Sequence, residues 1–324
     1  MGTDVLLTVV QNIRQRIISL GGQVRFGAQV TDILSENGCV TGLQINDEEV
    51  ISCDQVILAI GHSARDTFEK LYSLGIPMEP KPFAMGVRIE HLQENVDQAQ
   101  YGRHDPVLPP ADYKLVKHLD EETVYTFCMC PGGYVVAAAS EEGRVVTNGM
   151  SYADRDGVNA NAALLVTLNP KDFPFDGPLG GMVWQRQIEE AAYNLSGSYH
   201  APAQKVGDFL AGRASDGPGA VMPTYQPGVV WCDLHRVLPE KITRALKEAL
   251  PMLEGSLKGY ADPDSVLTAP ETRSSSPVRI VRGEQKQSVG LAGLYPAGEG
   301  AGYAGGIMSA AIDGMLCAEA LLQE

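Results

Sequence analysis

The chain has 324 residues, which is enough for two domains that each bury a core. Of these residues 44% are hydrophobic and 20% are charged, and the formal net charge of −15 predicts an acidic surface that repels nucleic acid and anionic membranes. No apolar run reaches the roughly 18 residues of a membrane span, and no signal-peptide pattern precedes the first predicted helix, so we expect a cytoplasmic protein without membrane or nucleic-acid partners.

The first part of the chain predicts an α/β domain. Apolar residues at helical spacing predict a helix that ends near residue 20, and Thr3 or Asp4 can cap its start. A short strand is expected at 23–27. From residue 30 to 51 apolar and polar residues alternate between turn signals, which predicts a three-stranded meander.

A continuous apolar run follows the meander. Residues 55–61 predict a strand that is covered on both faces, as in a parallel sheet, and Ser63 can cap a helix over 64–74. The next segment, 75–82, holds three prolines and predicts a rigid connector between domains.

Beyond the connector the pattern is mixed, and the chain then returns to the first domain. We expect strands at 84–89, 123–130, 134–139 and 144–148, and helices at 181–195 and 239–258. We therefore predict an α/β domain made of residues 1–76 and 270–324, interrupted by an α+β insert domain at 77–269.

Residues 291–315 carry the strongest functional signal. They read as a short buried strand, a loop with glycines clustered between Gly293 and Gly306, and a helix whose first backbone N–H groups suit an anionic or electron-rich ligand. The stretch from Gly300 to Gly305 matches G-x-G-x-x-G, but a dinucleotide fingerprint also needs a further strand and an acidic residue about 20 positions on. A tight turn in a packed sheet is the alternative.

Three other features could take part in chemistry. Cys128-Met-Cys130 ends a strand before a Pro-Gly-Gly turn and could be a redox or peroxide-reactive thiol site, although two packed thiols explain the pattern as well. Arg273 is followed by three serines that could bind a carboxylate or phosphate, or form a solvated loop. His62 lies where a strand gives way to a helix. It could line a cleft or be a packing residue. No Ser-His-Asp set, P-loop or clustered zinc ligands occur, so no catalytic residue is identified and no metal is expected.

With these residues in view the chain resembles the bacterial FAD-dependent dehydrogenases, which are two-domain flavoproteins with a glutathione-reductase-like FAD domain. The segments that carry the resemblance are 57–67, the Cys-Pro-Gly-Gly turn at 130–133 and, most specifically, 297–306. The resemblance implies a Rossmann-like FAD/NAD(P)-binding fold and an FAD-dependent oxidoreductase that moves a hydride between flavin and a small-molecule substrate, with NAD(P)H as a possible electron partner.

The same resemblance implies roles for particular residues. It places Val30 by the adenine, Ala59 and Gly61 near the pyrophosphate, Gly298 and Glu299 near the ribityl chain or pyrophosphate, and Gly305, Gly306 and Ile307 on the pyrimidine side of the isoalloxazine. Cys130 and Arg273 are the substrate-side candidates.

The chain departs from the family at its start. Such proteins begin with a strand, a G-x-G-x-x-G loop, a helix and a strand ending in Glu, which bind the ADP half of FAD, and no such segment precedes Met1. We therefore predict a fragment of a longer flavoprotein that binds FAD weakly or not at all, is inactive alone and self-associates through an incomplete sheet. The alternatives are a flavin-dependent RNA-modifying enzyme, which the acidic charge disfavours, and a non-catalytic truncated module.

Overall fold

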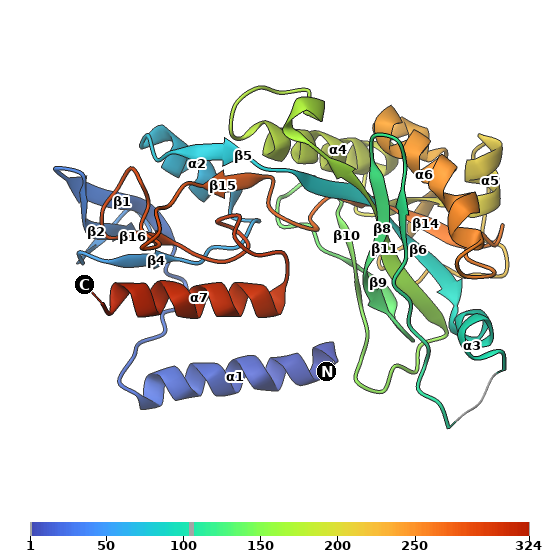
Figure 1. Cartoon of the computed structure of the whole chain (residues 1–324), viewed down its shortest axis with the longest axis horizontal. Coiled ribbons are helices and arrows are strands. Elements are labelled where there is room, and N and C mark those ends of the chain that lie inside the picture. The colour runs from blue at the N-terminus through green and yellow to red at the C-terminus, as the bar shows by residue number, and fades with distance from the viewer. Residues whose placement is uncertain (1, 104–106, 324) are drawn as a thin grey trace. The chain divides into compact units, whose positions relative to one another are not determined.

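The computed structural model describes residues 2–103 and 107–323, and Figure 1 shows their helices and strands. The chain divides into two compact units. Unit 1 contains the residues up to Leu20 with Ala84–Leu168 and Gln185–Thr272, and unit 2 contains Gly21–Phe83, Asn169–Trp184 and the residues from Arg273 onward. The domain limits predicted at 76/77 and 269/270 stay a prediction, and the compact units change over at 83/84 and 272/273.

Unit 1 is built on a seven-stranded mixed sheet with the order β13-β12-β14-β6-β11-β8-β7. The pair β12–β13 is parallel, whereas β12–β14, β14–β6, β11–β8 and β8–β7 are antiparallel. In chain order these strands are β6 (Phe83–Leu92), β7 (Val116–His118), β8 (Thr123–Cys130), β11 (Asn159–Leu168), β12 (Ala201–Lys205), β13 (Val229–Trp231) and β14 (Val266–Glu271). This sheet confirms the predicted mixed α/β fold.

The centre of this sheet is buried on both faces. Strands β6 and β11 bury nearly every residue, and Met85, Ile89 and Leu164 are fully enclosed. The amphipathic helix α6 (Glu240–Glu254) contacts β7, β8 and β11 (Figure 1) and buries an apolar stripe that includes Leu246 and Leu250. The predicted helix at 239–258 and strand at 123–130 are therefore confirmed.

The remaining elements of unit 1 lie outside this sheet. They are α1 (Thr3–Ser19), α3 (Gln93–Tyr101), β9 (Tyr134–Ala137), β10 (Thr147–Met150), α4 (Gly180–Ser196, which begins in unit 2), α5 (Val206–Ala211) and the 3-10 turn η2 (Leu234–Arg236). Strands β9 and β10 form an antiparallel pair.

Helix α1 is attached to unit 1 by its first residues. The Thr3 N–H donates to the Ser151 carbonyl (3.0 Å), and Asp4 Oδ1 accepts from the Ala153 N–H (3.0 Å). Asp4 is therefore occupied by a neighbouring loop, and the N-cap is Gly2, with no capping side chain among the described residues. The predicted cap by Thr3 or Asp4 is wrong. None of the described side chains of α1 is buried, although many are apolar.

Unit 2 contains the predicted meander and a parallel strand pair. The meander is β1 (Val30–Glu36), β2 (Cys39–Ile45) and β3 (Glu49–Ser52), and the parallel pair is β4 (Val56–Leu58) with β16 (Leu294–Pro296). The pair β5 (Met78–Pro80) and β15 (Val278–Ile280) is antiparallel, and the helices are α2 (Arg65–Ser73) and α7 (Ile307–Leu321), with the 3-10 turn η1 (Pro170–Asp172).

Two sequence predictions fail in unit 2. Residues 23–27 form no strand within the described chain, and all five are exposed, so nothing in this unit covers a strand there. The N-cap of α2 is Ala64 and not Ser63, because the chain turns one residue later and the Ser63 carbonyl accepts the Arg65 N–H (2.9 Å).

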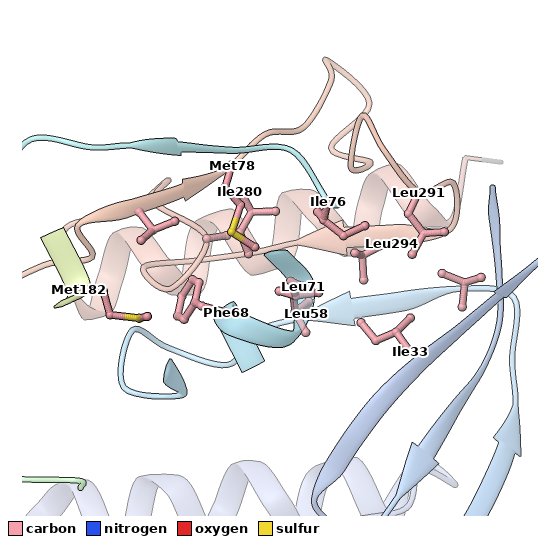
Figure 2. Packing of buried hydrophobic residues seen from close by; sticks show 13 residues of the cluster. Ile33, Leu58, Phe68, Leu71, Ile76, Met78, Met182, Ile280, Leu291 and Leu294 are labelled. Atoms are coloured by element: carbon pink, nitrogen blue, oxygen red, sulfur yellow. The ribbon is translucent and has the colours of Figure 1, made fainter. Parts of the chain in front are cut away.

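The core of unit 2 joins segments that lie far apart in the sequence. Figure 2 shows its side chains, which come from the meander, from β4 and α2, and from the C-terminal strands. Phe68 and Leu71 of α2 pack with Leu58 of β4, while Ile280 and Leu294 come from β15 and β16. This core fixes the ends of β4 and β16, from which the candidate site is built.

Candidate functional site

The loops that follow β4 and β16 come together in unit 2. The two strands are parallel, and the Ala297 N–H donates to the Leu58 carbonyl (3.0 Å) where both strands end. A Cβ atom on Gly300 would overlap the Gly61 carbonyl, so only glycine at residue 300 allows this close approach. The crevice at the carboxyl ends of parallel strands is the usual ligand site of open α/β sheets.

Charged and polar side chains gather at these loops. His62 Nε2 lies 3.9 Å from Glu299 Oε1. Burial raises the pKa of the Glu299 carboxyl, against the opposing charge of Lys81. Burial and the positive charge of Arg279 lower the pKa of Lys81. The pKa values of this acid and this base are therefore shifted toward each other, which suits groups that hold or move a proton.

The predicted substrate-side residue Arg273 also belongs to this part of unit 2. Its Nη1 donates to the Ser63 Oγ (3.1 Å), and Ser63 lies in the loop between β4 and α2. The structure thus brings Arg273 to the same strand-to-helix turn as His62, although the sequence analysis treated these two residues as separate features.

An ion pair that the sequence analysis missed holds the turn at Gly298. This glycine has a φ of 76°, and its N–H donates to Asp313 Oδ2 (2.7 Å). Arg282 Nη1 also donates to that oxygen (3.0 Å), and its guanidinium carbon lies 3.7 Å from the centre of the Tyr303 ring. The signal was present in the sequence, since Asp313 is an acidic residue in the middle of a largely apolar helix.

The ionisation of Asp313 follows from these contacts. Burial alone would raise the pKa of this carboxyl, but the hydrogen bonds from Arg282 and the Gly298 N–H, with the charge of Arg282, leave its pKa below the usual range. The carboxylate therefore stays charged and fixes the glycine loop to α7.

The first turn of α7 is open. No described atom lies within 4 Å of a Cβ placed on Gly305 or Gly306, and Ile307 is exposed. The N–H groups of a helix's first turn have no acceptor within the helix. The end of α7 can therefore accept an electron-rich group without any movement of side chains.

The predicted adenine-side residue lies in a pocket of the same unit. Val30 and Ala59 both line a cavity of about 560 Å³, together with Ile33, Val56 and Ile60. Its size and its largely apolar lining are those of small-molecule pockets. Val30 from the meander and Ala59 after β4 are thus brought together, whereas Gly305 and Gly306 lie at the start of α7.

A second cluster lies inside the sheet of unit 1 around Arg88, which is fully buried. Arg88 Nη1 donates to Glu271 Oε1 (3.2 Å), and Nε donates to Asn161 Oδ1 (3.1 Å). Arg88 Nη2 donates to the Cys128 carbonyl (2.9 Å) and lies 3.6 Å from the Sγ of Cys130, the other predicted substrate-side residue. Strands β6, β8, β11 and β14 each supply a member of this cluster.

A glycine makes room for this cluster. A Cβ atom on Gly149 of β10 would overlap the Arg88 guanidinium and Asn161 Oδ1. Burial raises the pKa of Glu271 to about 7 despite the adjacent Arg88 charge. Glu271 Oε2, Asn161 Nδ2 and Thr268 Oγ1 are buried without a hydrogen-bond partner in the part of the chain that the structure describes. The cluster is thus charged, enclosed and incompletely satisfied.

Two further kinds of site, for a metal ion and for a membrane span, can be assessed in the described residues. Within residues 2–103 and 107–323 no group of three or more His, Cys, Asp or Glu side chains is arranged to hold a metal ion. In the same residues no helix combines the length and the apolar character that crossing a bilayer requires.

Comparison with known proteins points to flavin. Residues 82–274 match the family model "FAD-dependent protein, C-terminal domain-like", and residues 3–85 match "Flavin containing amine oxidoreductase". An uncharacterised protein of Clostridium beijerinckii (strain ATCC 51743 / NCIMB 8052) is 48% identical over 329 residues, which cover 100% of this chain and 62% of that protein. The chain therefore spans less than two thirds of this relative's length.

Two solved structures show weaker similarity. Native FqzB is 17% identical with a TM-score of 0.32, covering 90% of this chain and 46% of the FqzB chain. A second FqzB structure is 14% identical with a TM-score of 0.29, covering 88% and 44%. At these scores the two structures support no argument about fold or function.

Proposed function

Since the chain belongs to the family of FAD-dependent proteins with this C-terminal domain, we propose that it forms the flavin-facing part of an FAD-dependent oxidoreductase acting on a small molecule. The observation that carries the proposal is the meeting of the loops after β4 and β16 beside the open first turn of α7. When bound, FAD supplies the capacity to accept or donate a hydride.

The residues present fit such a cofactor. Gly300 lies against the Gly61 carbonyl, and Gly305 and Gly306 leave open space at the start of α7. We propose that Gly298 and Glu299 approach the ribityl chain or pyrophosphate, and that the N–H groups at Gly306 and Ile307 face the pyrimidine side of the ring, where the helix end stabilises negative charge. Val30 would then lie by the adenine, and Ala59, which lines the same pocket, would lie near the pyrophosphate.

The polar groups beside the loops have roles that this placement suggests. His62, Glu299 and Lys81 can hold or move a proton near the pyrophosphate side, because burial brings the pKa values of Glu299 and Lys81 toward each other. Arg273, held by Ser63, is positioned to bind an anionic substrate group. The catalytic residues themselves stay unassigned.

The remaining parts of the proposal concern partners. We propose NAD(P)H as electron partner and no role for nucleic acid, in keeping with the net charge of −15. We also propose self-association through the incomplete sheet, with exposed apolar helix surface contributing to it. Helix α1 exposes Leu7, Val10 and Ile13, and α7 separately exposes Met308 and Met315.

A flavin titration tests the cofactor site. We expect the purified chain to quench FAD fluorescence saturably but weakly. The Gly305→Val variant should bind FAD at least about tenfold more weakly, a loss of roughly 1.4 kcal/mol, because the added side chain occupies the open space at the start of α7.

The control is thermal unfolding of the same two proteins. Gly305 has no neighbour within 4 Å of an added Cβ, so the variant should unfold at the wild-type temperature. The proposal fails if FAD produces no saturable quenching at any protein concentration, or if the variant binds FAD as well as the wild type does.

A further inference from the structure

Strand β8 is interrupted at Cys128. In the pairing of β11 with β8, Asn161 lies opposite Cys130 and Ala163 opposite Phe127, so two residues of β8 face one residue of β11. Cys128 takes a φ of 45°, a left-handed conformation that is strained for a non-glycine residue. Such bulges and strained residues are common beside active sites, where they direct a side chain.

The bulge gives the two cysteines different surroundings. Cys128 is exposed, whereas Cys130 is buried. The turn after Cys130 is held in place, since the Gly133 N–H donates to the Asn159 carbonyl (2.7 Å) and the Gly132 N–H donates to Gln93 Oε1 (2.7 Å). One thiol therefore faces the solvent and the other lies behind it in a fixed position.

The sulfur atoms interact with each other and with Arg88. The Cys130 thiol donates to the Cys128 carbonyl (3.3 Å), and a thiolate on Cys128 is a stronger acceptor for the same thiol. The hydrogen bond from Cys130, with the charge of Arg88, lowers the pKa of Cys128 to about 6. The same hydrogen bond, with burial, raises the pKa of Cys130.

We propose that Cys128 and Cys130 form a redox-active dithiol that exchanges with low-molecular-weight disulfides, with exposed Cys128 as the attacking thiolate and buried Cys130 as the resolving thiol. This site stands on the geometry of unit 1 and does not depend on the proposed flavin site.

The exchange proceeds in two steps. The Cys128 thiolate attacks one sulfur of the substrate disulfide, so that a Cys128–substrate disulfide forms, the substrate S–S bond breaks and one substrate thiolate leaves. Cys130 then attacks the Cys128 sulfur, releasing the second substrate thiolate, which takes up the proton that Cys130 loses. The substrate gains two electrons and becomes two thiols, and the protein pair loses two electrons and becomes a disulfide.

Arg88 explains why Cys130 can act second. Once Cys128 is bound in a disulfide it carries no charge, so the guanidinium 3.6 Å from Cys130 Sγ favours ionisation of Cys130 instead. Glu271 and Asn161 hold Arg88 in this position, and Gly149 leaves the space for it. Arg88 is thus a positioning residue that serves the two thiols in turn.

The first test uses the wild-type chain in buffers of reduced and oxidised glutathione, followed by alkylation of free thiols and mass spectrometry. Cleavage after Lys117 and Arg144 isolates one peptide that contains Cys128 and Cys130 and no other cysteine. As the buffer becomes more oxidising, we expect this peptide to change from the doubly alkylated form to an unalkylated form that is two hydrogen atoms lighter than the free dithiol peptide. Cys39, which is exposed and has no neighbouring cysteine in the sequence, is the internal control.

The second test follows the rate of alkylation by iodoacetamide against pH. Half of the maximal rate at Cys128 is expected near pH 6, and Cys130 should react far more slowly. In the Cys130→Ser variant the resolving thiol is absent, so the glutathione adduct of Cys128 should accumulate in place of the internal disulfide. The Cys39→Ser variant should behave as the wild type does.

Two results would overturn the proposal. One is a wild-type chain in which no glutathione ratio joins Cys128 to Cys130. The other is oxidation of the pair by hydrogen peroxide but not by glutathione disulfide, which would make the site a peroxide-reactive thiol instead.

Discussion

The two candidate sites are built from different parts of the chain. In unit 2 the site is made mainly of backbone, with glycines at 61, 298, 300 and 305 that bring loops together or leave space open. In unit 1 the cluster is made of side chains, with a fully buried Arg88 bonded to Glu271, Asn161 and the Cys128 carbonyl. A backbone site depends on where the chain turns, whereas a side-chain site depends on charges being matched.

This difference decides which substitutions are costly. A backbone site is disturbed by adding atoms at particular glycines, and the cost is steric. A buried charge cluster is disturbed by removing one partner, because the remaining charge is left without water or a counter-ion. The largest losses of stability are therefore expected in unit 1.

Replacement of Arg88 by Met should give the largest effect. It leaves Glu271 buried without its cation, and above pH 7, where Glu271 is ionised, breaking such a pair costs about 3–5 kcal/mol of the free energy of unfolding. Urea denaturation measures this loss. As a control, Arg25→Met removes one partner of the exposed Arg25–Glu49 pair and should leave stability unchanged within error. Equal losses in the two variants would show that the Arg88 cluster is not the more sensitive site.

The titration of Glu271 should give the next largest effect. Its pKa is raised from the usual 4.5 to about 7, so the folded state binds a proton more tightly than the unfolded state does between these values. The stabilisation that protonated Glu271 contributes is therefore fully present below about pH 4.5. It is lost as the pH rises to about 7, and the loss is about 3 kcal/mol of the free energy of unfolding.

The Glu271→Gln variant isolates this titration. Gln still offers Arg88 an oxygen but does not ionise, so its stability relative to the parent should rise as the pH goes from 4.5 to 7. Both proteins are best compared in the Cys128→Ser background, so that the neighbouring thiol does not titrate in the same range. Parallel stability curves for the two proteins would contradict a raised pKa at Glu271.

Local patterns in the sequence predicted much of unit 2. The alternation over residues 30–51 predicted the meander. The strand, glycine loop and helix expected near the C-terminus predicted β16 and α7. These features were predictable because they depend on residues that are neighbours in the sequence. The apolar run at 55–61 predicted a strand of a parallel sheet, and the structure pairs this strand, β4, with β16. The strand at 23–27 failed because nothing in the unit covers those residues, and the predicted Ser63 cap failed because α2 begins after Ala64.

The cluster in unit 1 could not be predicted in this way. Arg88 is separated from Cys130 by 42 residues, from Asn161 by 73 and from Glu271 by 183. Strand β11, which supplies Asn161, was missed because Asn-Ala-Asn-Ala-Ala has weak strand propensity and only its position in the middle of the sheet makes it a strand. Its small Ala side chains suit a strand that is buried on both faces of the sheet.

A glycine pair tests the steric nature of the unit 2 site. Gly300→Ala places a methyl group against the Gly61 carbonyl, and overpacking of this kind costs about 1–3 kcal/mol of unfolding free energy. Gly305→Ala adds the same atoms to open space in the same loop and should leave stability nearly unchanged. Thermal and urea unfolding of the pair measure the difference. If both variants unfold alike, the loops after β4 and β16 do not approach as closely as the structure shows.

The smallest of these effects is expected at Asp313, a charged residue of the unit 2 site. Asp313→Asn keeps one oxygen for the Gly298 N–H but removes the charge that faces Arg282, at a cost of about 1–2 kcal/mol. Because the pKa of Asp313 is lowered in the folded state, its contribution is present above the unfolded pKa, which is about 4, and is lost as the pH falls through the folded value. The stability difference between wild type and variant should therefore shrink on acidification below about pH 4, the direction opposite to that at Glu271. A difference that grows on acidification would mean that the folded state does not stabilise the Asp313 carboxylate, and that the ion pair with Arg282 does not anchor the glycine loop.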